Sequence, residues 1–247
     1  AVEGDVDGDA VAAQRVVAFG LAVGAVDLAA IARPLVVIDD EVLVKVNKVG
    51  LDATDFNIVS EDLKDIADGR DNIVIGHEMA GVVEEVGKGV KSLKKGDIVT
   101  MTVRRGCGQC HPCLHNQSDM CMTGLFTERG IHKLDGFLTE YAVDEEKYIV
   151  KLPKSLENYV ALLEPLSIVE KAVEQIKIIQ SRLPWACSHP EHSFLEERWG
   201  RCKNAIVIGA GPLGLLATAH LRLAGVNTST MDIVPENHLK AMLVNQL

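Results

Sequence analysis

Aromatic side chains are scarce in this sequence, and its positive charges are outnumbered by negative ones. Phe, Trp and Tyr make up only 4% of the residues, so a core drawn from the 47% hydrophobic fraction has to be mainly aliphatic. Lys and Arg number 25 against 35 Asp and Glu, which gives a formal net charge of −10. This balance disfavours nonspecific binding to nucleic acid or to an anionic membrane surface. We therefore expect neither of them as a partner.

A hydrophobic run long enough to span a membrane is also missing. The apolar run at residues 16–26 is about half as long as the ~20 residues that a membrane-spanning helix needs. The residues before it are acidic, among them Asp5, Asp7 and Asp9, whereas a signal peptide has a basic flank. We expect a cytoplasmic protein without a membrane span or an export signal. Within residues 1–33 we assign only a strand at 14–19.

Cysteine, by contrast, is present in a pattern that indicates a metal site. Four thiolates on one short loop suit tetrahedral coordination of a soft divalent metal, most simply zinc. All four positions are filled by cysteine, so the metal is expected to be structural. Disulfides are the alternative, which fits poorly with a sequence that shows no sign of secretion. The four residues are Cys107, Cys110, Cys113 and Cys121.

Two histidines and two further cysteines leave alternatives open. His111 and His115 lie inside the cysteine loop and could replace a cysteine ligand, although spare polar histidines are the simpler interpretation. Cys187 and Cys202 lie outside it. Each is expected to be a plain thiol, with a pair bridging a loop as the alternative.

Short valine-rich segments broken by glycine dominate residues 35–153. A polar turn is expected at 50–55, and a His77-Glu78 pair precedes the second segment. Short strands without long helical patterns predict a compact antiparallel domain that resembles a β-barrel. The expected strands are 41–49, the run that ends at Gly87, 98–103, 136–143 and 148–153.

The pattern changes after residue 155. Residues 156–180 have helical periodicity that Pro165 interrupts, and 182–203 is expected to be a loop or domain border. A buried strand at 204–208, a glycine turn, a helix at 215–224 and a strand at 226–231 then follow. This is the opening β-α-β of a dinucleotide-binding fold. Its candidate cofactor residues are Gly209, Gly211, Pro212, Leu213, Gly214 and Asp232.

Together these residues resemble the zinc-dependent medium-chain dehydrogenase/reductase superfamily. The markers are Gly-Leu-Asp-Ala-Thr-Asp at 50–55, Gly-His-Glu at 76–78, the cysteine loop, Glu164-Pro165 and the late glycine fingerprint. Within the superfamily the resemblance is greatest to archaeal glucose dehydrogenases, through residues 104–108, 127–137, 146–154 and 163–171.

The resemblance implies a mixed α/β protein in three stretches. Residues 1–181 would form a GroES-like catalytic domain with residues 1–33 unassigned, 182–203 a linker or border, and 204–247 the first part of a Rossmann domain. Complete relatives run further, so we expect a truncated chain that lacks four of the usual six Rossmann strands.

The resemblance also implies roles for single residues. Asp52, His77, Glu78 and Glu164 stand where the family places the ligands of a catalytic zinc or their neighbours. Asp52 departs from the usual cysteine, but a carboxylate is a competent zinc ligand. Thr54 matches the hydroxyl that relays a proton from the substrate. Glu128, Glu164 and Thr54 stand where sugar contacts are made.

The implied cofactors are structural zinc, catalytic zinc, and NAD or NADP. The second Rossmann strand ends in Asp232-Ile233-Val234, and an acid there accepts hydrogen bonds from the ribose 2′-hydroxyl and repels a 2′-phosphate. NAD is therefore favoured.

The implied reaction is oxidation of glucose or a related aldose at C1 to the lactone, in a protein that forms a homo-oligomer when full-length. One alternative is another zinc polyol or alcohol dehydrogenase of the same family. The other is an inactive zinc-binding fragment.

Overall fold

The computed structural model describes residues 38–60, 66–67, 70, 72–183 and 199–247. The strand expected at 14–19 and the environment of Cys187 lie outside these residues. No helix in the described part of the chain is both long and apolar enough to cross a membrane.

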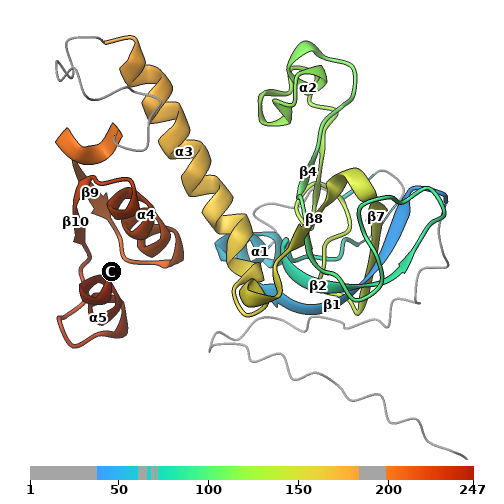
Figure 1. The fold of residues 1–247 in the computed structure, drawn as a ribbon, viewed down its shortest axis with the longest axis horizontal. Helices are drawn as coiled ribbons and strands as arrows, with labels where there is room; N and C mark the ends of the chain where they lie inside the picture. Colours follow the sequence, from blue (N-terminus) through green and yellow to red (C-terminus); the bar gives the residue numbers. More distant parts are fainter. Residues whose placement is uncertain (1–37, 61–65, 68–69, 71, 184–198) are drawn as a thin grey trace, which may run out of the picture. The chain divides into compact units, whose positions relative to one another are not determined.

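Five strands of the first half form one sheet (Figure 1), which is antiparallel as the sequence predicts. Their order is β7-β1-β2-β3-β8. Buried residues alternate with less buried ones along β3 and β7, as expected for strands with one face toward the core, whereas Val42, Leu43 and Val44 of β1 are all buried. The strands are β1 (Glu41–Gly50), β2 (Glu78–Val86), β3 (Ile98–Met101), β7 (Tyr141–Glu145) and β8 (Ile149–Leu152).

Aliphatic side chains fill the core of this sheet. Val42, Val44, Val83 and Val99 are fully buried there, and Phe137 is the one aromatic in the cluster. Full burial of a valine-sized side chain stabilises the fold by about 1.5–3 kcal/mol. The scarcity of aromatics therefore has the consequence expected from the composition.

A small three-stranded sheet carries the cysteine loop. Its order is β4-β5-β6, with β4 (Arg104–Arg105), β5 (Thr127–Arg129) and β6 (Lys133–Leu134). Between β4 and β5 lie α2 (His111–Leu114) and a 3₁₀ turn at Ser118–Met120 (Figure 1). We call residues 106–126 the cysteine lobe. No side chain of the lobe is buried, so the lobe has no apolar core of its own.

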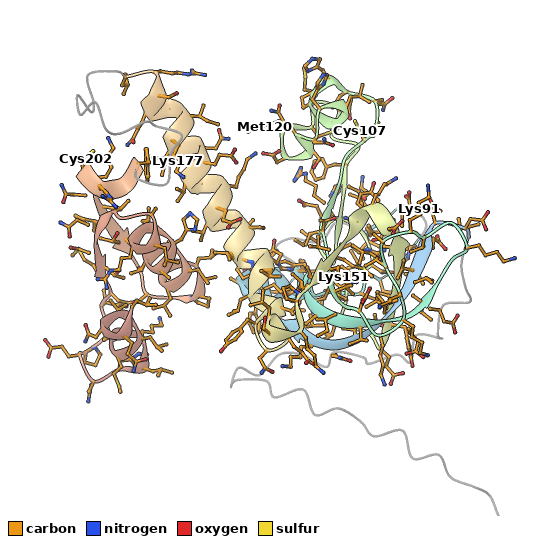
Figure 2. All side chains as sticks on the ribbon, viewed as in Figure 1. Lys91, Cys107, Met120, Lys151, Lys177 and Cys202 are labelled. Atoms are coloured by element: carbon orange, nitrogen blue, oxygen red, sulfur yellow. The ribbon has the colours of Figure 1, made fainter. Side chains whose placement is uncertain are left out.

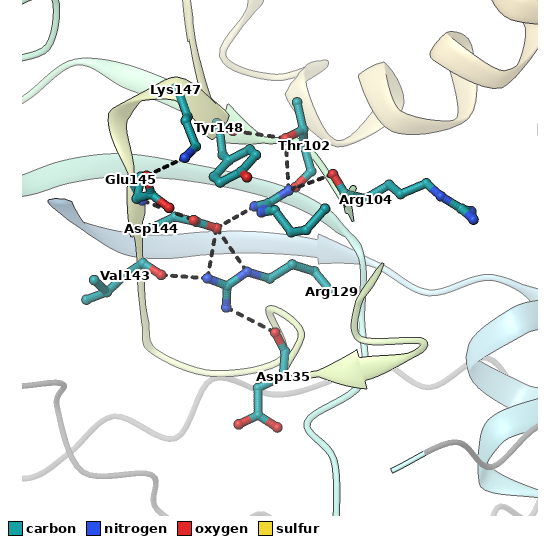
Figure 3. Close-up of polar contacts among 10 residues, drawn as sticks. Thr102, Arg104, Arg129, Asp135, Val143, Asp144, Glu145, Lys147 and Tyr148 are labelled. Atoms are coloured by element: carbon teal, nitrogen blue, oxygen red, sulfur yellow. Dashed lines mark hydrogen bonds and ion pairs between the residues drawn. The ribbon is translucent and has the colours of Figure 1, made fainter. Parts of the chain in front are cut away.

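A buried carboxylate ties β7 to the small sheet (Figure 3). Asp144 accepts hydrogen bonds from Arg105 and from Arg129, whose Nη2 lies 2.8 Å from Oδ2. The guanidinium of Arg105 also stacks on the Tyr148 ring, 3.8 Å from its centroid. All three charged side chains are at most 12% exposed. Each guanidinium therefore depends on Asp144 for its partner charge.

The second half begins with α3 (Leu163–Ser181), which packs against α4. A parallel pair follows, β9 (Asn204–Ile208) and β10 (Asn227–Met231), joined by α4 (Pro212–Leu223). This is the expected β-α-β. The chain then forms α5 (Leu239–Gln246). A second cluster of buried residues, Val173, Trp199 and Val226, belongs to this half.

Four expectations need correction. The polar turn at 50–55 becomes α1 (Ala53–Val59), because Asp52 caps a helix there. Only the end of the expected strand 136–143 is strand, since β7 begins at Tyr141. Pro165 does not interrupt a helix, because it lies in the first turn of α3, where its missing N–H has no partner to lose. The strand at 204–208 is present, but Ile206 and Ile208 are 66% and 87% exposed, since it pairs with one strand only in the described residues.

Candidate functional site

Asp52 stands at the start of α1 and organises the residues after it. Its Oδ1 accepts hydrogen bonds from the amides of Thr54 and Asp55, at 2.7 and 3.2 Å. Asp55 returns the contact by accepting from the Asp52 amide at 3.1 Å, which completes a capping box. The Thr54 hydroxyl donates to Asp52 Oδ2 at 3.1 Å. One carboxylate oxygen of Asp52 is thus fixed by the backbone, and the other by Thr54.

His77 lies between two carboxylates. Its Nε2 is 3.8 Å from Asp52 Oδ1, and its Nδ1 is 3.8 Å from Asp55 Oδ1. The ring is buried, and Nδ1 has no hydrogen-bond partner among the described residues. Asp55 is held in turn by the Gly76 amide at 2.8 Å. In metal sites a histidine typically coordinates the ion through one ring nitrogen, while its other ring nitrogen contacts a carboxylate.

Glu78 and Glu164 complete the cluster around His77. His77, Glu78 and Glu164 can each offer one ligand atom within 4.8 Å of the others, and so can Asp52, Asp55 and His77. Glu78 begins β2 and lies opposite Gly50 of β1. A Cβ on Gly50 would stand 2.0 Å from Glu78 Oε2. Only glycine leaves the space that this carboxylate occupies.

The carboxylates and the imidazole shift one another's pKa. Burial raises the pKa of Glu78 to about 7, opposed by the charge of His77 and assisted by Glu164, Asp52 and Asp55. Burial likewise raises the pKa of Glu164, with Asp52 and Glu128 adding to the effect. Burial acts to lower the pKa of His77, but the neighbouring carboxylates outweigh it and the pKa is raised. This concentration of negative charge favours a bound cation.

The donors fit a divalent metal ion. One imidazole and several carboxylates form a set that zinc accepts and that is harder than a cysteine-containing site. The buried Nδ1 of His77 beside Asp55 is the arrangement that leaves Nε2 free to coordinate. The structure places His77 in two such groups of donors, one with Asp52 and Asp55 and one with Glu78 and Glu164. The metal-ligand roles of these residues stay a prediction.

Glu128 lies at the edge of this cluster and is paired with an arginine. It is on β5, and its Oε1 accepts from Arg104 Nη1 at 2.7 Å. The side chains of Glu128 and Arg104 are 21% and 26% exposed. Glu128 is close enough for its charge to act on Glu164.

The four cysteines of the lobe converge (Figure 2 labels Cys107). Their sulfurs all lie within 4.8 Å of one another, against about 3.8 Å between ligands of a zinc ion with ~2.3 Å Zn–S bonds. No disulfide joins them. Hydrogen bonds from the Thr123 hydroxyl and from the amides of Gln109 and Cys110 lower the pKa of Cys107 to about 5. A thiolate is the form that binds metal.

The glycine loop lies between β9 and α4. Gly209 follows the strand, Gly211 caps α4, and Pro212 and Leu213 begin the helix. A Cβ on Gly214 would stand 1.8 Å from the carbonyl oxygen of Gly209, so glycine is required for the close approach of loop and helix.

Asp232 is turned into this loop. Its Oδ2 accepts from the Ala210 amide at 2.7 Å and its Oδ1 from the Val234 amide at 3.2 Å. Lys240 Nζ lies 3.9 Å from Oδ2. The Ala210 hydrogen bond is the main cause of a lowered Asp232 pKa, so the carboxylate is negatively charged at neutral pH.

Two residues that the sequence pattern did not single out belong to these sites. Asp55 supports His77, and Thr123 bonds the sulfur of Cys121 at 3.4 Å. Asp55 had a signal, because an acid three residues after Asp52 is the second half of a capping box. Thr123 had none beyond its nearness to a cysteine.

Two family descriptions match the chain. The alcohol dehydrogenase GroES-like domain covers residues 38–154, and the glucose dehydrogenase C-terminus covers residues 157–247. Glucose 1-dehydrogenase of Methanocella arvoryzae is 40% identical over 204 residues, which are 82% of this chain and 53% of that protein. Glucose 1-dehydrogenase 1 of Caldivirga maquilingensis is 38% identical over 208 residues, 84% of this chain and 54% of that protein. The chain spans about half the length of these relatives.

Solved structures of dehydrogenases also match the chain. Glucose dehydrogenase of Haloferax mediterranei, in complex with NADP, Zn and gluconolactone, matches with a TM-score of 0.70 at 31% identity, over 87% of this chain and 56% of that chain. Galactitol-1-phosphate dehydrogenase of Escherichia coli matches with a TM-score of 0.67 at 26% identity, over 86% of this chain and 53% of that chain.

Proposed function

The chain belongs to the zinc-dependent medium-chain dehydrogenase/reductase superfamily, and from this we propose that it is part of an enzyme that oxidises glucose or a related aldose at C1 with NAD(P). The observation that carries the proposal is the position of His77, with Nε2 toward Asp52 and Glu164 beside it. Relatives named glucose 1-dehydrogenase support the sugar substrate.

Asp52, His77 and Glu164 would hold a catalytic zinc, with Glu78 next to it and Asp55 fixing the imidazole. When bound, such an ion supplies Lewis acidity that lowers the pKa of the anomeric hydroxyl. Glu128 would contact other hydroxyls of the sugar. The carboxylates of the site would also hold the substrate in one orientation. Such positioning is a large part of an enzyme's contribution to the rate of hydride transfer to a nicotinamide.

Thr54 is the proposed proton relay. Its hydroxyl hydrogen is donated to Asp52 Oδ2, so the lone pairs of its oxygen are left to accept a hydrogen bond from the substrate hydroxyl. As the Thr54 oxygen takes the proton of the substrate hydroxyl, its own hydrogen would pass to Asp52 Oδ2, the carboxylate oxygen to which it is bonded. Thr54→Val removes this path and keeps the shape of the side chain.

Gly209, Gly211 and Gly214 would receive the pyrophosphate of the nucleotide at the start of α4. We propose NAD rather than NADP, because Asp232 is charged and Ile233 beside it offers no positive charge. A like-charge contact costs several kcal/mol, so catalytic efficiency with NAD should exceed that with NADP by at least about tenfold. Lys240 is the group that could compensate, and Lys240→Met should widen the difference. Equal use of NADP by the parent would contradict the assignment of Asp232.

The test is steady-state sugar oxidation by the natural polypeptide that carries this sequence, followed by formation of reduced nicotinamide. Asp52→Ala and His77→Ala should each cost more than the roughly 10–100-fold that loss of an outer-shell partner costs. Asp40→Asn, an exposed acid outside the site, serves as the control. Full activity of Asp52→Ala would exclude this residue as a metal ligand.

A polyol is the second candidate substrate, favoured by the likeness to galactitol-1-phosphate dehydrogenase. A panel of glucose, galactose, sorbitol, threonine and simple alcohols separates the two. Zinc binding without turnover on the whole panel would instead support a metal-binding protein without enzyme activity.

A further inference from the structure

Arg104 stands at the base of the cysteine lobe and faces away from the buried Asp144 (Figure 3). Neighbouring residues of a strand point to opposite faces, so Arg105 points to Asp144 while Arg104 points to the lobe and to β5. The buried charges of the Asp144 network are therefore supplied by Arg105 and Arg129. Arg104 contributes only its backbone carbonyl, which accepts from Arg105 Nη1 at 3.2 Å, and its guanidinium lies outside the network.

The guanidinium of Arg104 donates hydrogen bonds from its edge and stacks on an aromatic ring with its face. Nη1 donates to Glu128 Oε1 at 2.7 Å, and Nε donates to the carbonyl oxygen of Ser118 at 3.0 Å. The planar group lies 3.7 Å from the centroid of the Phe126 ring. The planar guanidinium of arginine can bond two separate acceptors and stack on a ring at the same time. The ammonium group of lysine cannot make all three contacts at once.

The Ser118 carbonyl leads directly to a cysteine ligand. The same oxygen accepts the amide of Cys121 at 3.2 Å. On the other side of Ser118, a Cβ on Gly106 would stand 3.2 Å from the Ser118 Cβ and 2.9 Å from the Cys113 sulfur. This packing leaves little room for Ser118 to move independently of the cysteines.

We propose that Arg104 is a positioning residue that couples the metal-bearing lobe to Glu128, so that the sugar-binding carboxylate is in place only while the lobe is closed around its metal. The part that concerns the sugar rests on the proposed function, whereas the coupling of Glu128 to the lobe does not. The connection runs from the Glu128 carboxylate through the Arg104 guanidinium and the Ser118 carbonyl to the Cys121 amide.

The coupling is tested by the rate at which the lobe loses zinc to a chromophoric chelator. The measurement uses an Asp52→Ala background, so that the cysteine lobe is the zinc source. Arg104→Gln and Glu128→Gln should each speed release by about tenfold, the effect of losing a hydrogen bond between charged groups. The double variant should be no faster than Arg104→Gln alone, because both changes break one connection.

Arg70→Gln is the matched control, since Arg70 also pairs with a carboxylate, that of Asp135 at 2.9 Å, and this partner lies outside the lobe. Its release rate should equal that of the parent. Unchanged release in Glu128→Gln, or rates that multiply in the double variant, would overturn the coupling.

The effect on the sugar is tested in the polypeptide with Asp52 intact. Arg104→Gln should raise KM for glucose by about tenfold and change kcat by less than about twofold, because a misplaced Glu128 weakens binding rather than chemistry. Arg104→Lys keeps the positive charge but loses the planar guanidinium, so its KM and kcat should resemble those of Arg104→Gln. Full activity of Arg104→Lys, or a loss in kcat alone, would show that Arg104 does not position Glu128. If the parent oxidises no sugar, the proposed function fails, and zinc release still decides the coupling.

Discussion

Asp55 combines three contacts in one buried side chain that is 2% exposed. It accepts from the Asp52 and Gly76 amides and faces His77 Nδ1. Asp55→Asn keeps the size but removes the charge that supports a metal-bound imidazole. We expect affinity for metal at His77 to fall by about 10–100-fold. Titration with Co²⁺ followed by its absorption spectrum measures this, and the zinc of the cysteine lobe, which should stay bound, is the internal control.

Asp97 gives the fold a contribution that depends on pH. Its Oδ2 accepts from Lys151 at 2.8 Å and from the Lys94 amide at 3.0 Å, and these bonds lower its pKa, Lys151 most. A lowered folded-state pKa means that the stabilisation is present above the unfolded pKa of about 3.9 and is lost as pH falls through the folded value. The difference in free energy of unfolding between the parent and Asp97→Asn should therefore be constant from pH 7 to about pH 5 and shrink below about pH 4. A constant difference down to pH 3 in denaturant titrations would contradict this.

At the residue scale, the sequence singles out Asp52, His77 and Glu164 because the family pattern is recognised from residue types and their order alone. Their role as metal ligands stays a prediction. The placement of Glu128 could not be predicted, since its pairing with Arg104 joins residues far apart in the sequence. The contacts of Asp232 with the Ala210 and Val234 amides could not be predicted from the sequence, and its role toward a ribose stays a prediction.

We expect the cysteine lobe to depend on a bound metal for most of its order. Leu114, Met120 and Met122 are 62%, 57% and 78% exposed, so little apolar burial offsets the entropy of ordering the loop. Removal of zinc by a chelator should abolish hydrogen-exchange protection in residues 106–126 while the amides of β1 and β2 stay protected. Cys110→Ser should have the same local effect. Undiminished zinc in Cys110→Ser with unchanged melting would rule out the four-cysteine site.

Asp144 of β7 pairs with Arg105 of β4 and Arg129 of β5, so its removal should destabilise the packing of all three strands. Removing one partner leaves Arg105 and Arg129 buried without their counter-charge, which costs about 3–5 kcal/mol. Glu145→Gln is the neighbouring control, because its pair with Lys147 is exposed (Figure 3) and is worth at most about 1 kcal/mol. Denaturant unfolding of Asp144→Ala and Glu145→Gln measures both. Equal effects would show that burial of the Asp144 network is unimportant.

At the element scale, β1, β2 and β9 could be predicted closely, because valine-rich segments between glycines leave few alternatives. The helix α1 was missed because its seven residues are too few to show a helical period, and its existence depends on the Asp52 cap. The burial of β9 was misjudged for another reason. An apolar strand is buried only when neighbours cover both of its faces, and a sequence pattern does not show which neighbours are present.

At the scale of the whole molecule, the two halves are unequally stabilised. Among the residues that the structure describes, the core cluster of the first half has ten buried residues and that of the second half has three. In the second half the described sheet has two strands, fewer than the three or more that independent stability usually needs. Ile206, Ile208 and Met231 of this sheet are exposed. Apolar side chains left in water contribute nothing to the stability of this half.

We therefore expect the present chain to unfold in two steps on heating, with the second half first. Trp199 is 4% exposed and reports on the second cluster, and a Trp185→Phe background makes it the sole tryptophan. Its fluorescence should change at a lower temperature than the loss of hydrogen-exchange protection in β1. Val226→Ala, which removes packing from the second cluster, should lower the first transition alone, whereas Val44→Ala should lower the second. A single coincident transition by both probes would contradict this and show that the two halves unfold as one cooperative unit.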